Sequence, residues 1–461
     1  MKTSRSILFF YLVLVLIVYN WLDNSVLLPN HVKTVLLGHF LIHSLACYFS
    51  FGLLKFQKFP FVLLISAVNL ITFFYAPSIL DPIDFQLGTL NYPILNDLFW
   101  GYLIFYTTYF FLLHRSLSIT NSFLTRNIKI VYRLDALKRL KKVFLTLFVL
   151  QLITDLPVNG LNEFIILFTI GLYCIGFLTN QNTRNENIIF FSLLVYQSIR
   201  VVTSGLIYNI IYFGMFLIVI FKNYGLQSRR GIVLMSSLIS FYLIFSVLFS
   251  SVKMDYRATD FSSDSVFEKI IVIYNLLSEN NNYVSVTSVQ DQSKHGAIWR
   301  LSYPLSAISL VKEKTPYIIP YWNGESYLPI FTKFIPRFFW PDKPKENMGQ
   351  EFGHRYGILA WDNLTTSMNT PIVAEAYMNY GMLGFYFVFF FMAIVIASTY
   401  STVNSSTSND PISVDTIVNT IVIAIAAVYF TQWESNLTMM IGKFIILYIT
   451  TYVIRKFVIQ A

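Results

Sequence analysis

The stretch 376–399 reads AYMNYGMLGFYFVFFFMAIVIAST and contains no charged side chain. An α-helix rises about 1.5 Å per residue, so about 20 apolar residues in a row cross the hydrocarbon core of a bilayer, which is about 30 Å thick. Such a helix satisfies its own backbone hydrogen-bonding groups, which lipid cannot do. The stretch therefore predicts a transmembrane helix.

Similar apolar stretches fill most of the remaining chain, some of them shorter than 20 residues and flanked by polar residues. Together they predict an all-α polytopic integral membrane protein with about 12 transmembrane helices. The twelve segments cover 7–22, 34–54, 59–75, 94–113, 143–158, 164–180, 187–204, 206–221, 231–250, 376–399, 415–431 and 437–454.

The composition agrees with this class of protein. Of the 461 residues, 55% are hydrophobic and only 12% are charged, whereas about 25% of the residues of a soluble protein are charged. The two cysteines, Cys47 and Cys174, both lie in apolar segments. A disulfide framework or a thiolate metal site is therefore not expected.

One polar segment, residues 251–375, interrupts the apolar pattern, and we call it the island. It holds 12 Lys or Arg and 13 Asp or Glu of the chain's 33 basic and 24 acidic residues, so the net charge of +9 arises elsewhere. The loop 115–142 alone holds eight Lys or Arg against the single Asp135. Basic residues in short loops are typical of the cytoplasmic side of a membrane. The surplus therefore indicates topology, and no nucleic-acid partner is expected.

With twelve spans, the basic loops fall on one side and both termini are cytoplasmic. The island then lies on the outer face, as one large loop between spans 9 and 10. We expect three parts: a transmembrane bundle over 1–250 (spans 1–9), an extracytoplasmic loop domain with interfacial helices over 251–375, and a second bundle over 376–461 (spans 10–12).

The island is expected to contain helices. Ser265-x-x-Glu268 is a capping-box signature in front of the apolar residues 270–277. A second helix is expected over 297–314 with a kink at Pro304, and both helices are apolar enough to lie along the membrane surface.

Arg200 is the first candidate for chemistry, because it lies in an apolar segment. A charge there costs about 2.5–3.5 kcal/mol on insertion scales, and intramembrane ionisable residues are functional candidates by default. In the expected topology Arg200 approaches the outer face, where the island lies. Snorkelling to the interface or capping of a carbonyl at the Ser204-Gly205 break explains it equally well.

The island contains a rigid run, Ile335-Pro-Arg-Phe-Phe-Trp-Pro-Asp-Lys-Pro344. Its three prolines fix φ near −65°, so the charged side chains between them have little conformational freedom. Arginine matches phosphate oxygens bidentately, so the candidate ligands of an anionic lipid headgroup include Arg300, Arg337, Lys343 and Arg355. The alternative for each is an ordinary loop charge paired with Asp342, Glu346 or Glu351.

Three residues are candidate general bases: His354, Asp362 and Glu375. Thr370-Pro371 predicts the start of the helix that continues into the tenth span, which places Glu375 in its first turns, where a carboxylate also complements the helix dipole. Asn379 follows four residues later on the same face and could orient Glu375. His354 follows Gly353 in an expected flexible loop, and histidine is the residue type that base catalysis near neutral pH prefers.

His39 and His43 share a helix face at a spacing that suits a metal. Because no carboxylate or thiolate pattern accompanies them, packing and hydrogen bonding explain them better. The island also lacks the motifs of a nucleotide motor, a zinc protease or a metal-bound nucleotide-sugar site. No metal and no cofactor are expected.

The island resembles a segment of the O-antigen and capsular repeat-unit polymerases (Wzy-like). The resemblance rests on Ile335–Pro344 and on its sequel: Gly349, Phe352-Gly353, Tyr356-Gly357, Thr366-Ser367, Pro371 and Glu375-x-Tyr-x-Asn379-x-Gly381. It covers about 50–90 residues, and the rest is similar only in hydropathy and number of spans. Many members have a second large outer loop, whereas this chain has a short turn near Ser204.

This resemblance implies a glycosyltransferase in the bacterial cytoplasmic membrane that joins oligosaccharide repeat units carried on polyprenyl diphosphate. Arg200, Arg300, Arg337 and Lys343 would bind the diphosphate leaving group, with Trp340, Asp342 and Asn379 contributing to the substrate site. Glu375 or His354 would be the base. Lipid-linked oligosaccharides, membrane lipids and a chain-length-regulating co-polymerase are the expected partners.

Two other functions share part of this pattern. A ligase that transfers finished glycan to an acceptor would use similar charges and a similar loop. A repeat-unit flippase, which is not an enzyme, predicts charges distributed along many spans and short loops. The concentration of charged candidates in one loop favours the polymerase.

Overall fold

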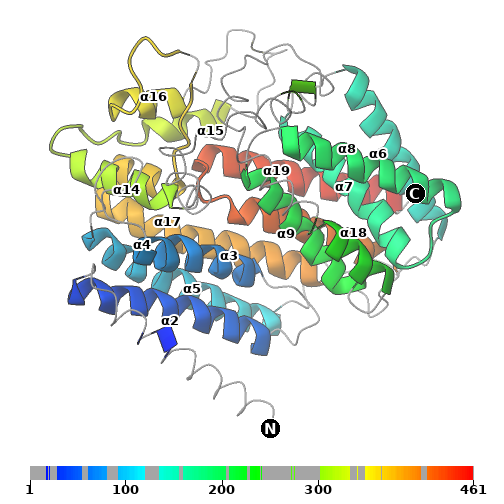
Figure 1. Cartoon of the computed structure of the whole chain (residues 1–461), viewed down its shortest axis with the longest axis horizontal. Coiled ribbons are helices and arrows are strands. Elements are labelled where there is room, and N and C mark those ends of the chain that lie inside the picture. The colour runs from blue at the N-terminus through cyan, green and yellow to red at the C-terminus, as the bar shows by residue number, and fades with distance from the viewer. Residues whose placement is uncertain are drawn as a thin grey trace, which may run out of the picture. The chain divides into compact units, whose positions relative to one another are not determined.

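The structure of this protein is a computed structural model in which helices are the regular elements of the described residues (Figure 1). This confirms the all-α class. The described residues are 17–18, 20, 29–53, 61–79, 92–119, 134–154, 159–203, 207–225, 229–238, 240, 271–272, 275, 302–332, 340, 348–364, 366–405 and 413–459.

A described helix overlaps most of each expected apolar segment from 34 to 221 and from 376 to 454. The N-terminal set is α2 (Asn30–Leu53), α3 (Phe61–Asn69) with η1 (Leu70–Tyr75) and α4 (Ala76–Ile79), α5 (Pro93–Ile119), α6 (Leu134–Thr154), α7 (Asn159–Leu178), α8 (Arg184–Thr203) and α9 (Ile207–Tyr224). The C-terminal set is α17 (Ile372–Ser405), α18 (Val414–Thr431), α19 (Leu437–Val453) and η5 (Ile454–Ile459).

Four of the described helices are long and apolar enough to cross a membrane by length and composition. Their apolar stretches are Leu161–Leu178, Ile372–Ser401, Val414–Thr431 and Leu437–Lys456. The chain is thus a helical protein with membrane-spanning character, and the full count of twelve spans stays a prediction.

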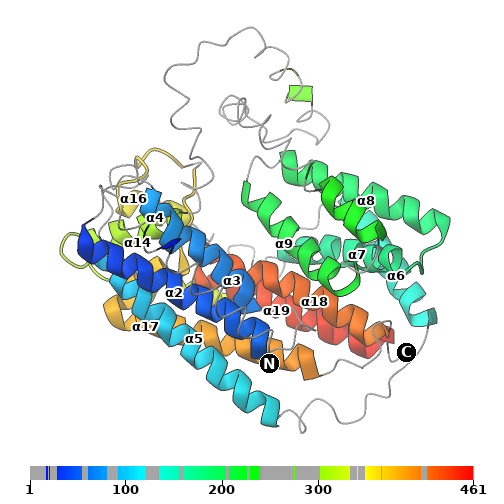
Figure 2. The same cartoon turned by 60° about the horizontal axis from the view of Figure 1, so that its bottom comes forward.

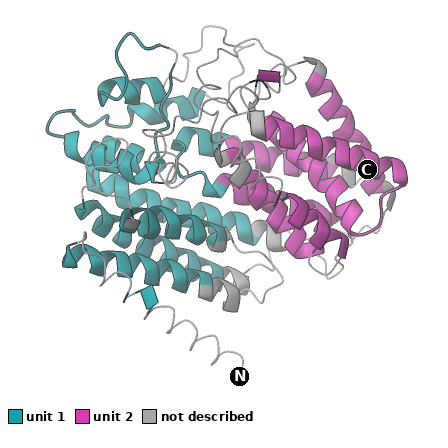
Figure 3. Ribbon diagram, viewed as in Figure 1, with its two compact units in different colours: residues 1–120, 297–401, 430–442 teal, residues 121–296, 402–429, 443–461 magenta. Residues whose placement is uncertain are grey.

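The chain divides into two compact units, coloured teal and magenta in Figure 3. Unit 1 combines 1–120, 297–401 and 430–442, and unit 2 combines 121–296, 402–429 and 443–461. The described island residues from 302 onward therefore belong to the same compact unit as the first helices of the chain.

In unit 1, contacts between side chains fix the relative directions of α2, α3 and α5 (Figures 1 and 2). His39 of α2 contacts the carbonyl of Leu95, and His43 lies further along α2 beside Tyr106, further along α5. These two helices are therefore parallel. Ser66 of α3 contacts Tyr106, whereas the later Asn69 contacts the earlier Tyr102, so α3 is antiparallel to both. These directions agree with the expected alternation of successive spans, which stays a prediction.

Helices α5 and α17 approach closely. A Cβ atom on Gly101 would lie 2.4 Å from the ring of Phe389, so a larger residue would clash. The Tyr102 and Phe389 rings are 4.9 Å apart and nearly perpendicular. Small residues at such crossings let membrane helices pack closely.

The island elements of unit 1 are α14 (Tyr303–Lys314), η4 (Glu325–Tyr327), α15 (Leu328–Thr332) and α16 (Met348–Arg355). Pro304 lies in the first turn of α14, where proline is tolerated, and residues 297–301 of the expected helix lie outside the described residues. Most of α14 is buried, and Lys312 forms an ion pair with Asp97 near the start of α5. Its buried side chains pack within unit 1, and the expected position along the membrane surface stays a prediction.

Ion pairs also occur among the described residues of unit 2. Lys141 of α6 is almost fully buried and donates to Asn182 (2.6 Å) and to Glu186 (3.0 Å). Lys443 lies 3.4 Å from Glu163. Paired charges of this kind lower the cost of burying an ionic group in an apolar environment.

Candidate functional site

The described part of the candidate site is built around a break in α17. Tyr380 and Gly381 have non-helical backbone angles, with φ of −136° and +61°. A short first segment, residues 372–379, thus precedes the long apolar part of the helix. A break in a helix removes backbone hydrogen bonds, and these groups need other partners.

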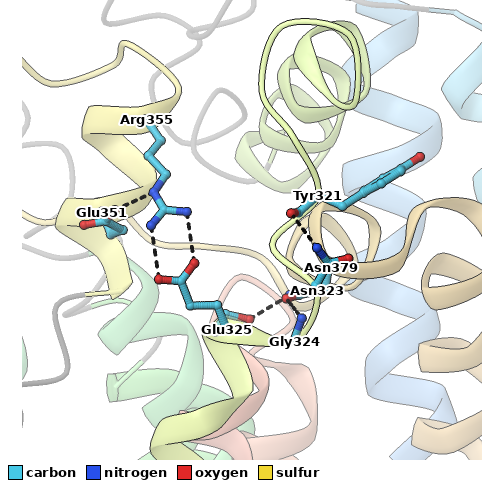
Figure 4. A network of polar contacts seen from close by, with 8 residues as sticks. Tyr321, Asn323, Gly324, Glu325, Glu351, Arg355 and Asn379 are labelled. Atoms are coloured by element: carbon cyan, nitrogen blue, oxygen red, sulfur yellow. Dashed lines mark hydrogen bonds and ion pairs between the residues drawn. The ribbon is translucent and has the colours of Figure 1, made fainter.

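The segment 321–327 supplies those partners (Figure 4). The backbone N–H of Trp322 donates to the carbonyl of Met378 at 2.9 Å. The N–H of Gly324 donates to Oδ1 of Asn379 at 2.8 Å. The island is therefore attached to α17 by backbone hydrogen bonds at the position of the break.

Two glycines make this close approach feasible. Gly324 and Gly381 have φ of +90° and +61°, in the left-handed region that glycine adopts most readily. A Cβ atom would lie 2.4 Å from the Tyr380 hydroxyl at Gly324, and 2.7 Å from the Tyr321 hydroxyl at Gly381. Each tyrosine hydroxyl thus occupies the space that a side chain would take.

Asn379 lies at the centre of a group of buried side chains that also includes Glu375 and Ser326. We call this group the buried layer. Its Nδ2 donates to the Ser326 hydroxyl and to the backbone carbonyl of Glu375, both at 2.7 Å. We expected Asn379 to orient the carboxylate of Glu375, but its described bond to that residue is to the backbone. Asn379 instead ties the first turns of α17 to the island.

Glu375 is fully buried, and its Oε2 accepts a hydrogen bond of 2.6 Å from the backbone N–H of Leu437. Leu437 is the first residue of α19, so the carboxylate caps the N-terminus of another helix. The backbone N–H of Ile372 also donates to the carbonyl of Trp433 at 3.1 Å. This geometry gives Glu375 a structural role at the point where α17 and α19 begin, and its role as a base stays a prediction.

An ionic layer lies next to this buried layer, since Glu325 directly precedes Ser326 in the chain. Arg355 donates from Nη1 and Nη2 to the two carboxylate oxygens of Glu325, at 3.1 and 3.2 Å, and from Nε to Glu351. Its guanidinium also lies 4.2 Å from the centre of the Trp322 ring. Partial burial alone would lower the pKa of Arg355, but the hydrogen bonds with Glu325 and Glu351 outweigh it and raise the pKa. The pairing with Glu351 confirms, for Arg355, the alternative of an ordinary paired charge.

Tyrosines around this layer remain protonated at neutral pH. Burial raises the pKa of Tyr356 to about 12. Burial and, secondarily, the charge of Glu375 raise the pKa of Tyr327. The tyrosine hydroxyls therefore act as neutral donors and acceptors.

His354 lies in the last turn of α16 and is largely buried, so the expected flexible loop is wrong. Its Nε2 is 3.0 Å from the carbonyl of Asn363, and its ring lies against that of Trp361. A histidine held in this way stabilises the end of the helix. Its expected role as a base stays a prediction.

The remaining predicted site residues are Trp340, Arg200, Arg300, Arg337, Asp342 and Lys343. Trp340 is partly exposed. Arg200 is exposed in the last turn of α8, in unit 2, and its approach to the island stays a prediction. Arg300, Arg337, Asp342 and Lys343 lie outside the described residues.

The sequence reasoning missed Glu325, Ser326 and Asp97. Glu325 and Ser326 follow Asn323-Gly324, a dipeptide typical of turns, and that signal could have pointed to them. Asp97 is an ionisable residue in the apolar segment 94–113. It satisfies the criterion that singled out Arg200.

Among the residues that the structure describes, no group of three or more His, Cys, Asp or Glu could hold a metal ion. The described site instead offers a bidentate ion pair, partly exposed carboxylates and neutral tyrosine hydroxyls. These groups bind and orient hydroxyl groups well.

Comparisons with known proteins leave the family open. No protein-family model matches the chain, and searches of curated proteins and of solved structures found no significant match.

Proposed function

We propose that the protein polymerises oligosaccharide repeat units that are carried on polyprenyl diphosphate into a surface polysaccharide. In this proposal it is a bacterial cytoplasmic-membrane protein with twelve spans, cytoplasmic termini and an outer island. The reaction transfers a growing glycan from its lipid diphosphate to a hydroxyl group of the next lipid-linked unit.

The observation that carries the proposal is the attachment of the island to the starts of membrane helices. Lys312 pairs with Asp97 near the start of α5, and Ser326 and Gly324 bond to Asn379 in the first segment of α17. Substrates that are anchored in lipid must reach a site at the membrane surface. An island built onto helix ends supports such a site.

The reaction needs neutralisation of the departing diphosphate and orientation of the attacking hydroxyl. We assign the first task to Arg337 and Lys343, with Arg300 and Arg200 as further cations. For the second task the described site offers Glu325, whose side chain is 55% exposed and held by Arg355. Glu375 and His354, the bases expected from the sequence, are buried in this structure and would need to become accessible.

Reconstitution tests this function directly. Purified full-length protein in lipid nanodiscs should convert the purified lipid-linked repeat unit of its own strain into longer lipid-linked oligomers, which gel electrophoresis resolves. A strain that lacks the protein should carry single repeat units on the final carrier. Long chains that accumulate on polyprenyl lipid in that strain would identify a ligase, and units trapped on the cytoplasmic face would identify a flippase.

Arg337 tests the diphosphate site within this assay. Replacing Arg337 with Lys keeps the charge but removes the bidentate geometry. We expect polymer formation to fall by at least about 100-fold, because one lost transition-state donor costs about this much. The variant should still insert into membranes, and normal chain length in it would exclude this role.

The flippase has one observation in its favour. His39 and His43 of α2 are fully buried and continue through Tyr106 to Ser66 in a chain of polar contacts. Polar chains inside membrane helices occur in transporters. A transport assay of fluorescent lipid-linked oligosaccharide in proteoliposomes separates this function from polymerisation.

A further inference from the structure

A second cluster of polar side chains lies beside the break in α17, and we call it the tyrosine cluster. It gathers residues from α5, α14, the segment after α14 and α17, all within unit 1. Its members are Asp97, Lys312, Tyr317, Tyr321, Tyr377 and Tyr386.

The ion pair between Asp97 and Lys312 anchors the cluster. Both side chains are about four-fifths buried, at 18% and 20% exposure. Because the two charges cancel, the pair offers a fixed acceptor and a fixed donor without attracting an anion or a cation.

The four tyrosines are linked to this pair through Tyr377 and Tyr386, which have Asp97 as an electrostatic neighbour. Tyr377 has Tyr321, Asp97 and Tyr317 as electrostatic neighbours, and Tyr386 has Asp97. The hydroxyl of Tyr321 occupies the space above Gly381. Among the described residues, no hydrogen bond uses the hydroxyl of any of these four tyrosines.

Unused hydroxyl groups beside a neutral ion pair match one kind of ligand. A sugar ring presents hydroxyls at its edge and C–H groups on its face, and a tyrosine provides both an aromatic face and a polar end. Tyr317 is 90% exposed, so its ring is open to such a face. A phosphate group would find one lysine that is already paired.

We propose that the tyrosine cluster is a binding subsite for a sugar ring of the glycan, separate from the cations that hold the diphosphate. The inference rests on the proposed function, because it names the part of that substrate which this surface holds. It assigns Asp97 and Lys312 to ring hydroxyls and Tyr317 to the ring face. The hydroxyl of Tyr321 adds a hydrogen bond at the break.

Binding of a glycan that lacks lipid and phosphate tests the subsite. The probe is the repeat-unit oligosaccharide released from its polyprenyl diphosphate by mild acid, added to full-length protein in nanodiscs. Saturation-transfer NMR and a titration give the Kd. We expect the double variant Tyr317→Ala, Tyr321→Phe to raise this Kd at least about tenfold, since one lost hydrogen bond of about 1.4 kcal/mol accounts for that factor.

The matched control is Tyr452→Ala, an exposed tyrosine near the end of α19 in unit 2, which should leave the Kd unchanged. Asp97→Asn should also weaken binding, and its thermal unfolding is measured to separate this effect from misfolding. Tyr317→Ala alters only an exposed side chain, so it tests the subsite even if Asp97→Asn unfolds.

The outcomes separate this inference from the proposed function. If the double variant binds the oligosaccharide more weakly and the wild type forms no polymer, the subsite is supported and the polymerase is rejected. Polymer formation together with unchanged binding in the double variant would reject the subsite alone. A double variant that binds the oligosaccharide normally but is no longer stabilised by phosphatidylglycerol vesicles would identify a lipid headgroup site. That result would also overturn the inference.

Discussion

Two of the polar networks among the described residues of unit 1 differ in charge and in burial. The bundle network joins His39, His43, Tyr106 and Ser66 inside α2, α3 and α5. The island network joins Arg355, Glu325 and Glu351, next to Asn379 and Ser326. The first is uncharged and buried, whereas the second is ionic and partly exposed.

The bundle network has a defined direction. The carbonyl of Leu95, 2.7 Å from Nε2 of His39, can only accept, so this nitrogen carries the proton. Nδ1 of His39 then accepts from His43 at 3.5 Å, and Nδ1 of His43 accepts from Tyr106 at 2.8 Å. Each of these side chains thus donates a hydrogen bond to a neighbour or accepts one from it, and none of them needs to be charged.

The island network keeps its ionic groups near solvent. The side chains of Arg355, Glu325 and Glu351 are 31%, 55% and 40% exposed. Exposed ion pairs contribute little to stability, but accessible carboxylates can bind a ligand. We therefore expect the bundle network to serve folding, and under the proposed function the island network would serve recognition.

The largest expected effect tests the buried layer of the island. Glu375→Ala removes the cap of α19 and leaves a cavity, so we expect a loss of about 3 kcal/mol in the free energy of unfolding. Glu375→Gln keeps an oxygen acceptor for the N–H of Leu437 and should cost less than about 1 kcal/mol. Denaturation by SDS in mixed micelles measures both. A stable Glu375→Gln variant that makes no polymer would instead identify Glu375 as the base.

The break in α17 is the next test. Gly381→Ala forces a side chain into a left-handed conformation and into the Tyr321 hydroxyl, so we expect a loss of about 2 kcal/mol. Gly214→Ala in α9 is the control, because a Cβ atom there has no neighbour within 4 Å. That exchange should be neutral or stabilising by up to about 1 kcal/mol. Equal effects at the two glycines would contradict the strained geometry.

His43→Leu tests the bundle network. Hydrogen bonds between membrane helices contribute about 0.6 kcal/mol on average, so we expect a loss of about 1 kcal/mol when both contacts of His43 are removed. Polymer formation per folded molecule should remain unchanged. A selective loss of activity or of transport in a stable variant would show that the bundle network has a functional role.

The smallest expected effect on stability belongs to Arg355→Lys. Lysine keeps the charge but loses the bidentate contact with Glu325 and the stacking on Trp322, at a cost of about 0.5–1 kcal/mol. Polymer formation should fall by more than this loss of stability explains, because Glu325 would no longer be held in place. Chain-length analysis beside thermal unfolding checks this, and parallel losses of both would assign the ion pair a structural role only.

Much of the fold follows from local sequence. Uninterrupted apolar segments predicted the helices of the bundle, since a chain without charged residues cannot remain solvated and must pair its backbone groups internally. Thr370-Pro371 predicted the start of the helix that carries Glu375 and Asn379, and the structure begins α17 at Ile372. The expected sidedness of the bundle and the catalytic roles of the sequence-derived residues stay predictions.

The tertiary structure decided what these residues touch. A helix start next to Glu375 suggested a carboxylate that complements its own helix, but the carboxylate caps α19, 62 residues further along the chain. The partners of Asn379 lie in the island, 53 and 55 residues away. Periodicity and hydropathy report on neighbours within a few turns, whereas such contacts depend on which helix ends pack together.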